Sequence, residues 1–413
     1  MNHFERHDGR LFAEDVALSQ LAATYGTPLY VYSRATLVRH VKVWREALSG
    51  LDALICYAVK ANSNLAILHL LAKEQLGFDI VSGGELARVQ RAGGSAERTV
   101  FSGVGKAREE MEAALAAGVL MFNVESAAEL EQLAAIASAA GKRAPISIRV
   151  NPEVDAKTHP YIATGLKQSK FGVPFGDARA LYERARALPS LEVVGIDCHI
   201  GSQILSLDPF REALHRVLEL AAELRNAGFA LSLFDAGGGL GAPYAEEQPP
   251  DPAAYGALLR KMLGDTGYRV VLEPGRVLMA NAGVLLTRVR LLKHSNGKTF
   301  AVVDAAMNDL IRPALYQAFH AIEVDEERAP EARFDIVGPV CESSDFLAKD
   351  RLLPDLREND LLMIRGAGAY GFSMASQYNS RPRAAEVLVD GASARIIRAR
   401  ETHEDLWRGE TIS

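Results

Sequence analysis

The chain has 413 residues and a formal net charge of −6, with 48% hydrophobic and 24% charged residues. This length allows two domains, and the composition is typical of globular proteins. The acidic balance disfavours nucleic acid as a partner, because nucleic-acid binding selects basic patches. Runs of 18 apolar residues are missing, so we expect no membrane-spanning helix and no membrane partner.

The three cysteines, Cys56, Cys198 and Cys341, are far apart and form no CxxC motif. This spacing argues against a disulfide framework and a structural zinc site, so we expect no metal. It fits a reducing compartment, which we take to be the cytoplasm. Residues 1–15 lack the apolar core of a signal peptide.

Short apolar runs alternate with helical segments between residues 53 and 276, after an apolar run at 29–32 that is a candidate partner for the first of them. The alternating runs are rich in Val, Ile, Leu and Phe, as strands buried on both faces are. One intervening segment begins with the helix-capping pattern Ser126-x-x-Glu129. The eight runs are 54–59, 78–81, 99–102, 120–124, 146–150, 193–199, 231–235 and 269–272. They predict an α/β fold with a (β/α)₈ TIM-type barrel, and a doubly wound open sheet is the alternative.

After residue 276 strand-like runs follow one another without regular helices between them, which indicates a mostly β-sandwich or β-barrel domain. We therefore place the barrel at residues 34–276 and the β domain at residues 1–33 and 277–413.

Reactive residues of such barrels lie at the carboxyl ends of the strands. Lys60 ends the first run, and the next acidic residue downstream is Glu74. Removal from water favours a neutral amine, which carbonyl cofactors capture as a Schiff base. A solvated lysine at a strand end is the alternative.

Further polar or glycine-rich segments end the later runs. The turn 237–239 and Gly275 match the loops that often bind phosphate in barrels, although a plain tight turn is also possible. Glu273 suits a partner for a pyridine nitrogen, or an ion pair with Arg276. His199 either stacks on a planar ring or is an ordinary core histidine.

Three segments of the predicted β domain also carry reactive groups. Cys341 lies beside acidic residues, which predicts a raised pKa and a proton donor, whereas a free cysteine is usually a small buried hydrophobe. Tyr370 lies in a glycine-rich loop. Arg312 and Tyr316 are four residues apart, so they lie on one face if this segment is helical, and such a pair suits a carboxylate.

These segments together resemble the diaminopimelate decarboxylases, which belong to the alanine-racemase-like class of pyridoxal-phosphate enzymes. The resemblance extends from about residue 26 to 383. It is carried by the motifs YAVKAN at 57–62, DIVSGGEL at 79–86, NPEVD at 151–155, HIGSQ at 199–203, GGG at 237–239, EPGR at 273–276, CESSD at 341–345 and YNSRPR at 378–383.

The resemblance implies decarboxylation of meso-2,6-diaminopimelate to L-lysine and CO2, the last step of lysine biosynthesis, with pyridoxal 5'-phosphate. Lys60 would carry the cofactor covalently, His199 would stack on its ring, and Cys341 would protonate Cα. The cofactor would contact Lys60, Asp79, His199, Ser202, Gly238, Gly239, Glu273, Pro274, Gly275, Arg276 and Tyr370. The substrate would contact Arg276, Arg312, Tyr316, Glu342 and Tyr370.

The resemblance also implies a homodimer in which the partner subunit supplies Cys341 and Glu342 to each site, and a loop at 155–171 that covers it. The alternative is a decarboxylase of the same fold for ornithine, arginine or carboxynorspermidine, which the pair Arg312 and Tyr316 disfavours. A racemase of this class pairs the ring nitrogen with arginine where this chain has Glu273. A non-catalytic relative usually loses Lys60 or Cys341.

Overall fold

The computed structural model describes residues 2–156, 158–159, 164–165 and 169–412. The chain forms two compact units. The barrel unit comprises Val41–Ala242 and Gln248–Val277, and the β unit comprises Met1–His40, Pro243–Glu247 and Leu278–Ser413. Helix α2 (Arg34–Ala47) contains the division after His40.

The barrel unit is a closed ring of parallel strands, in which each strand pairs in parallel with the strands on either side of it. In the described residues the ring consists of β5 (Ala53–Ala58), β6 (Gly77–Ile80), β7 (Thr99–Phe101), β8 (Met121–Val124), β9 (Ala144–Asn151), β11 (Leu191–Asp197), β12 (Leu233–Asp235) and β13 (Arg269–Leu272). Pairing of β13 with β5, and of β8 with β9, closes the ring, and β10 (Val173–Pro174) adds to β9. The predicted barrel is therefore confirmed, and the open sheet is excluded.

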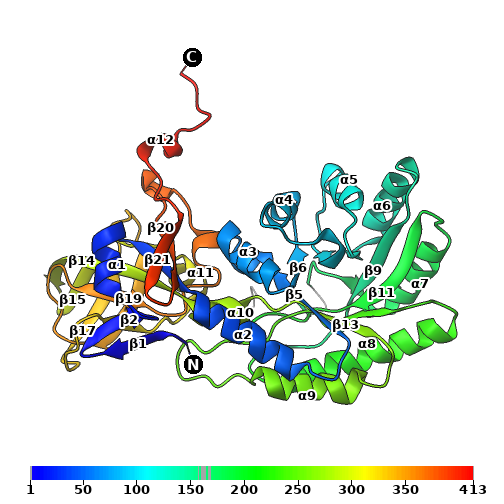
Figure 1. The fold of residues 1–413 in the computed structure, drawn as a ribbon, viewed down its shortest axis with the longest axis horizontal. Helices are drawn as coiled ribbons and strands as arrows, with labels where there is room; N and C mark the ends of the chain where they lie inside the picture. Colours follow the sequence, from blue (N-terminus) through cyan, green and yellow to red (C-terminus); the bar gives the residue numbers. More distant parts are fainter. Residues whose placement is uncertain (1, 157, 160–163, 166–168, 413) are drawn as a thin grey trace. The chain divides into compact units, whose positions relative to one another are not determined.

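Helices lie outside this ring of strands (Figure 1). They are α3 (Leu65–Lys73), α4 (Gly83–Arg91), α5 (Arg108–Ala117), α6 (Ala127–Ala139), α7 (Phe175–Arg186), α8 (Asp208–Asn226) and α9 (Pro252–Leu263), and α10 (Arg276–Met279) follows β13. The Ser126 side chain caps α6 by accepting the N–H of Glu129 at 3.2 Å, as the sequence predicts. The Glu129 side chain reaches the N–H of Glu125 instead of returning to the cap.

The β unit contains a sheet with the strand order β18-β17-β15-β14-β4-β20-β21, to which β19 and β16 are joined through β14. Its members are β4 (Leu29–Ser33), β14 (Gly283–Ser295), β15 (Lys298–Val303), β16 (Ile322–Val324), β17 (Ala332–Val337), β18 (Phe346–Leu353), β19 (Leu361–Ile364), β20 (Ala385–Asp390) and β21 (Ser393–Arg398). A small sheet of β1 (Phe4–His7), β2 (Arg10–Ala13) and β3 (Val16–Ala17) and the helices α1 (Leu18–Tyr25), α11 (Arg312–Tyr316) and α12 (His403–Leu406) complete the unit.

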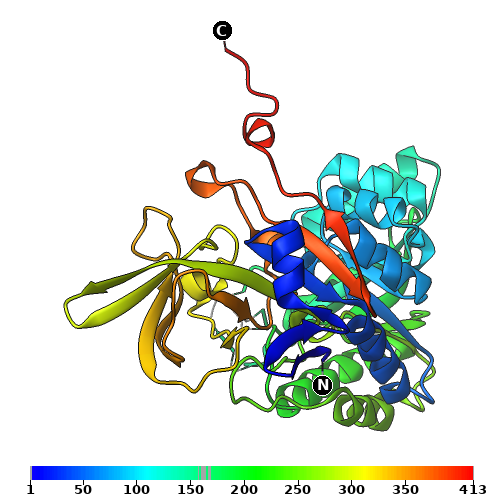
Figure 2. The same ribbon diagram turned by 60° about the vertical axis from the view of Figure 1, so that its left-hand side comes forward.

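The position of β4 corrects an expectation from the sequence. This strand does not pair with the first barrel strand. It pairs antiparallel with β14 and parallel with β20, and in Figure 2 the orange-red β20 lies beside the blue N-terminal strands. All five residues of β4 are buried, so a central place in a sheet satisfies both of its edges and both of its faces. Its partners follow more than 240 residues later, and nothing in the local pattern indicates them.

Candidate functional site

Lys60 lies in the 3-10 turn η1 (Val59–Ala61), immediately after β5, and its side chain is 37% exposed. Its Nζ donates a hydrogen bond to Oδ2 of Asp79 at 2.7 Å. Asp79 is on β6, where it is the register partner of Ala58. No acidic residue lies close to Lys60 in sequence, but the parallel pairing of β5 with β6 places the carboxylate of Asp79, 19 residues away, beside it. The ion pair holds the amine at the carboxyl end of the strands.

Glu273 follows β13 and is 6% exposed. Its carboxylate accepts a hydrogen bond from the hydroxyl of Ser102 at 3.2 Å. Burial raises the pKa of Glu273 well above its usual range, and the carboxylates of Asp235 and Asp79 raise it further, whereas Lys60 lowers it. A cation placed against this group would favour its ionised form.

A chain of hydrogen bonds extends from Glu273 across the barrel. The Asn123 amide donates to Ser102 Oγ and to Asp235 Oδ2, both at 3.2 Å, and Asp235 Oδ1 accepts the N–H of Gly237 at 2.9 Å. Sequence reasoning assigned no role to Ser102 or Asn123. Both are buried polar residues in apolar runs, Ser102 at the end of 99–102 and Asn123 inside 120–124, and that contrast is the signal that could have found them.

The turn at 237–239 brings backbone close to Glu273. A Cβ added at Gly238 would lie 2.2 Å from the carbonyl oxygen of Glu273, and Gly237 and Gly239 have φ values of +65° and +115°. The turn therefore requires glycine for two reasons, close approach and positive φ.

The N–H of Gly238 donates to His199 Nδ1 at 3.1 Å. Burial lowers the pKa of His199 well below its usual value, and the charges of Arg149 and Lys60 lower it further. The imidazole is therefore neutral. Because Nδ1 accepts, the ring proton is on Nε2.

Arg276 and Ser202 meet beside this turn. Nε and Nη2 of Arg276 donate to Ser202 Oγ at 3.2 and 3.0 Å, and the arginine is 7% exposed. The carbonyl of Pro274 accepts the N–H of Ala58 at 3.2 Å, which joins the segment around Gly275 to the strand that leads to Lys60. The barrel unit thus brings together an amine, a carboxyl group, a neutral imidazole and a cationic donor group.

The other predicted site residues belong to the β unit. Arg312 and Tyr316 are the first and last residues of α11, so the segment that carries them is helical. Tyr370 has a φ of +55°, a conformation uncommon for residues other than glycine and frequent at functional sites.

Cys341 and Glu342 lie on an exposed loop beside Tyr378 and Asn379. The N–H of Cys341 donates to Asn379 Oδ1 at 2.8 Å. Hydrogen bonds from Ser344 and Tyr378 lower the pKa of Glu342, so its side chain is a carboxylate at neutral pH. Tyr378 and Asn379 belong to the motif YNSRPR at 378–383, to which the sequence analysis assigned no role.

Asp345 fixes the start of this loop. Its carboxylate accepts the N–H groups of Met307 and Val340, both at 2.7 Å, and the residue is 4% exposed. The predicted covering loop at 155–171 includes residues 157, 160–163 and 166–168, which are outside the described residues, so it stays a prediction.

Known proteins are similar in sequence to this protein over its whole length. The family model for "Pyridoxal-dependent decarboxylase, pyridoxal binding domain" matches residues 34–280. Diaminopimelate decarboxylase of Pseudomonas aeruginosa is 54% identical over 413 residues, which are 100% of this chain and 99% of that protein. The chain belongs to the diaminopimelate decarboxylase family.

Two solved members of this family have the same fold. Diaminopimelate decarboxylase from Helicobacter pylori complexed with L-lysine is 46% identical, with a TM-score of 0.92 over 94% of this chain and 98% of that one. The enzyme from M. jannaschii in co-complex with L-lysine is 37% identical, with a TM-score of 0.95 over 100% of this chain and 99% of that one.

The residues of the barrel unit fit the pyridoxal cofactor that defines the family. Lys60 would provide an amine for the aldehyde, and Glu273 would provide an acidic group for the ring nitrogen. Arg276, Ser202 and the backbone of the glycine turn would provide donors for a phosphate. Within the described residues, none of the helices has the length and apolar content needed to cross a bilayer.

Proposed function

We propose that this protein decarboxylates meso-2,6-diaminopimelate at its D-configured centre, giving L-lysine and CO2 in the last step of lysine biosynthesis. The observation that carries this assignment is the meeting of Lys60, Glu273, His199 and the glycine turn in one barrel. The charge of Lys60 acts on both Glu273 and His199, and His199 contacts the turn through Gly238.

Pyridoxal phosphate, when bound, supplies the electron sink for the bond between Cα and the departing carboxylate. Lys60 would hold it covalently, His199 would support its ring, and Glu273 would keep its nitrogen protonated. The neutral state of His199 suits this role, because a second cation near a protonated ring would be unfavourable. Further contacts would come from Asp79, Ser202, Gly238, Gly239, Pro274, Gly275, Arg276 and Tyr370.

The substrate roles follow from charge. The carboxylate that does not react would be bound by Arg276, Arg312 and Tyr316, and the distal ammonium would pair with the carboxylate of Glu342. Cys341 would deliver a proton to Cα after CO2 leaves, and Tyr370 would contact both substrate and cofactor.

The assembly we propose is a cytoplasmic homodimer in which Cys341 and Glu342 act in the partner's site. The exposure of Cys341 and its position on a loop of the β unit support this arrangement, because a proton donor that acts in another subunit must lie at the surface of its own.

Replacement of Lys60 by alanine tests the function. We expect Lys60→Ala to lose the absorbance of protein-bound cofactor, its fixation by borohydride, and CO2 release from diaminopimelate. Lys42→Ala is the matched control, since the Lys42 side chain is 74% exposed on α2. Full activity in Lys60→Ala would contradict the proposal. Faster CO2 release from ornithine than from diaminopimelate would contradict the substrate assignment.

A further inference from the structure

The buried arginine Arg312 is held by a histidine to which sequence reasoning gave no role. Arg312 is 6% exposed, and its Nη1 lies 2.9 Å from Nε2 of His320. A guanidinium has donors and no acceptor, so Nε2 of His320 must accept this hydrogen bond.

The other side of the His320 ring fixes its protonation. Nδ1 lies 2.7 Å from the carbonyl oxygen of Arg365. A carbonyl only accepts, so Nδ1 carries the proton and the imidazole is the neutral Nδ1–H tautomer. The backbone carbonyl of His320 accepts from Arg351 at 2.7 Å, and the residue is fully buried. Both the ring and the backbone of His320 are therefore fixed.

Tyr244 supports the face of the same guanidinium. The Cζ of Arg312 lies 4.4 Å from the centre of the Tyr244 ring, a distance at which the cation and the ring attract each other. The rings of Tyr244 and His320 meet edge to face at 5.4 Å. The Glu247 carboxylate accepts the N–H groups of Tyr244 and Ala245 at 3.0 and 2.8 Å, which fixes the segment that carries the tyrosine.

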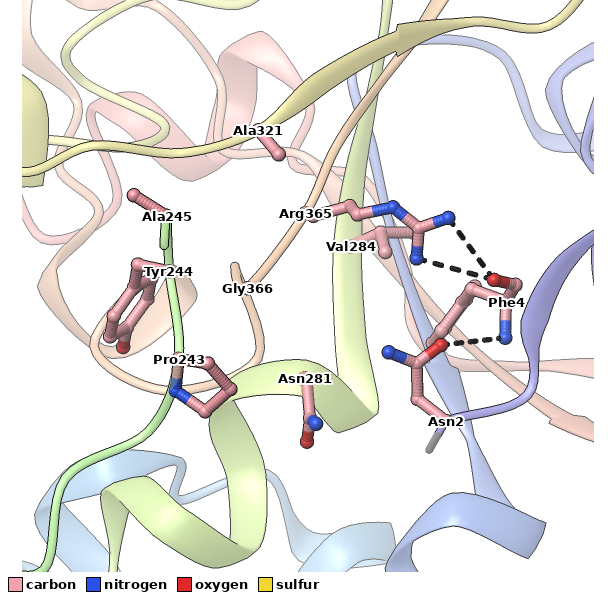
Figure 3. A pocket seen from close by; sticks show the side chains of 10 residues that line it. All are labelled: Asn2, Phe4, Pro243, Tyr244, Ala245, Asn281, Val284, Ala321, Arg365 and Gly366. Carbon is pink, nitrogen blue, oxygen red and sulfur yellow. Dashed lines mark hydrogen bonds between the residues drawn. The ribbon is translucent and has the colours of Figure 1, made fainter. Parts of the chain in front are cut away.

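One short segment sets the positions of both partners. Tyr244, Arg365 and Gly366 line the same cavity of about 210 Å³ (Figure 3). Arg365 supplies the carbonyl that orients His320, and a Cβ at Gly366 would lie 3.0 Å from the Tyr244 ring. The segment Pro243–Glu247 lies within the barrel sequence but belongs to the β unit. Tyr244 is therefore in the same unit as Arg312, the residue that it contacts.

We infer that Tyr244 and His320 are positioning residues that fix Arg312 for the distal carboxylate and so contribute to the choice of substrate. The inference rests on the proposed function. The hydrogen bond sets the rotation of the guanidinium and the ring sets its plane before a ligand binds. An arginine fixed in this way loses less conformational freedom on binding than a mobile one.

The test compares ligands that have the distal carboxylate with a ligand that lacks it. In the holoenzyme, His320→Leu should raise the KM for diaminopimelate and the inhibition constant of L-lysine by roughly 3- to 10-fold. Inhibition by pentane-1,5-diamine, which has no carboxylate, should stay constant, as should the absorbance of bound cofactor. His320→Gln, whose oxygen can replace Nε2 as acceptor, should recover most of the lysine affinity.

Tyr244→Leu and Tyr244→Phe provide a second pair, because Tyr244 is only half-buried and its replacement leaves the core intact. The leucine variant should weaken lysine binding and the phenylalanine variant should retain most of it. His294→Leu, on the exposed hairpin β14–β15, is the matched control.

Equal weakening of lysine and diamine binding, or wild-type lysine affinity in both leucine variants, would overturn the inference. A wild-type enzyme that releases no CO2 from diaminopimelate would instead overturn the proposed function.

Discussion

At the scale of single residues, the chemistry depends on partners that are distant in sequence. Lys60 is paired with Asp79, and Glu273 is bonded to Ser102, 171 residues away. The types of the reactive groups could be predicted because amines, thiols and carboxylates have fixed chemistries. Their charge states could not, because burial and neighbouring charges set them. His199 is neutral for this reason.

The thiol at the exposed loop provides a direct test of proton delivery. We expect Cys341→Ala to lower turnover roughly 10²- to 10⁴-fold, the range for loss of a positioned acid. Cofactor affinity and the absorbance of bound cofactor should not change, since Cys341 is not among the residues proposed to hold it. Rates of CO2 release and a cofactor titration measure the two effects.

Ser343→Ala is the matched control for this variant, because Ser343 is an exposed residue of the same loop. It should retain the wild-type rate. A Cys341→Ala enzyme with the same rate would show that another group protonates Cα.

At the scale of elements, the barrel strands could be predicted because each is a short apolar run buried on both faces. The observed β13, Arg269–Leu272, coincides with its prediction, and the observed β5 is shifted by one residue from 54–59. β4 was misplaced because strand pairing is non-local. Ser102 and Asn123 were missed because their hydrogen bonds form only once the ring is closed.

The glycine turn gives a prediction at this scale. Gly238→Ala would place a methyl group 2.2 Å from the carbonyl oxygen of Glu273, so the turn or the β13 segment must shift. Such overpacking costs about 1–3 kcal/mol, which corresponds to roughly 5- to 150-fold in affinity if the strain is relieved at the cofactor site. We expect the affinity for the cofactor to decrease by a factor in this range, as measured by titration of the apoenzyme.

Gly176→Ala is the control for this substitution. Gly176 is on α7 with no atom within 4 Å of an added Cβ. The melting temperature of the Gly176→Ala protein should therefore equal that of the wild type or be slightly higher. Unchanged cofactor affinity in Gly238→Ala would mean that the turn does not contribute to the phosphate site.

At the scale of the whole molecule, the proposed sharing of sites predicts complementation. Lys60→Ala and Cys341→Ala subunits should each be inactive alone. After they are mixed and allowed to exchange, half of the dimers have one intact site, so about a quarter of the wild-type activity should return. CO2 release after denaturation and joint refolding measures this. No recovery, with mixed dimers present in native mass spectra, would contradict the sharing of sites.

The pairing of β4 has a consequence for synthesis on the ribosome. β4 contains residues 29–33, yet its two neighbours are β14 and β20, which begin at residues 283 and 385. The nascent chain therefore carries an apolar strand with both edges open while the whole barrel is translated and can fold. A chain truncated before residue 385 would lack β20 and leave one edge of β4 permanently exposed, and such an edge is a template for aggregation.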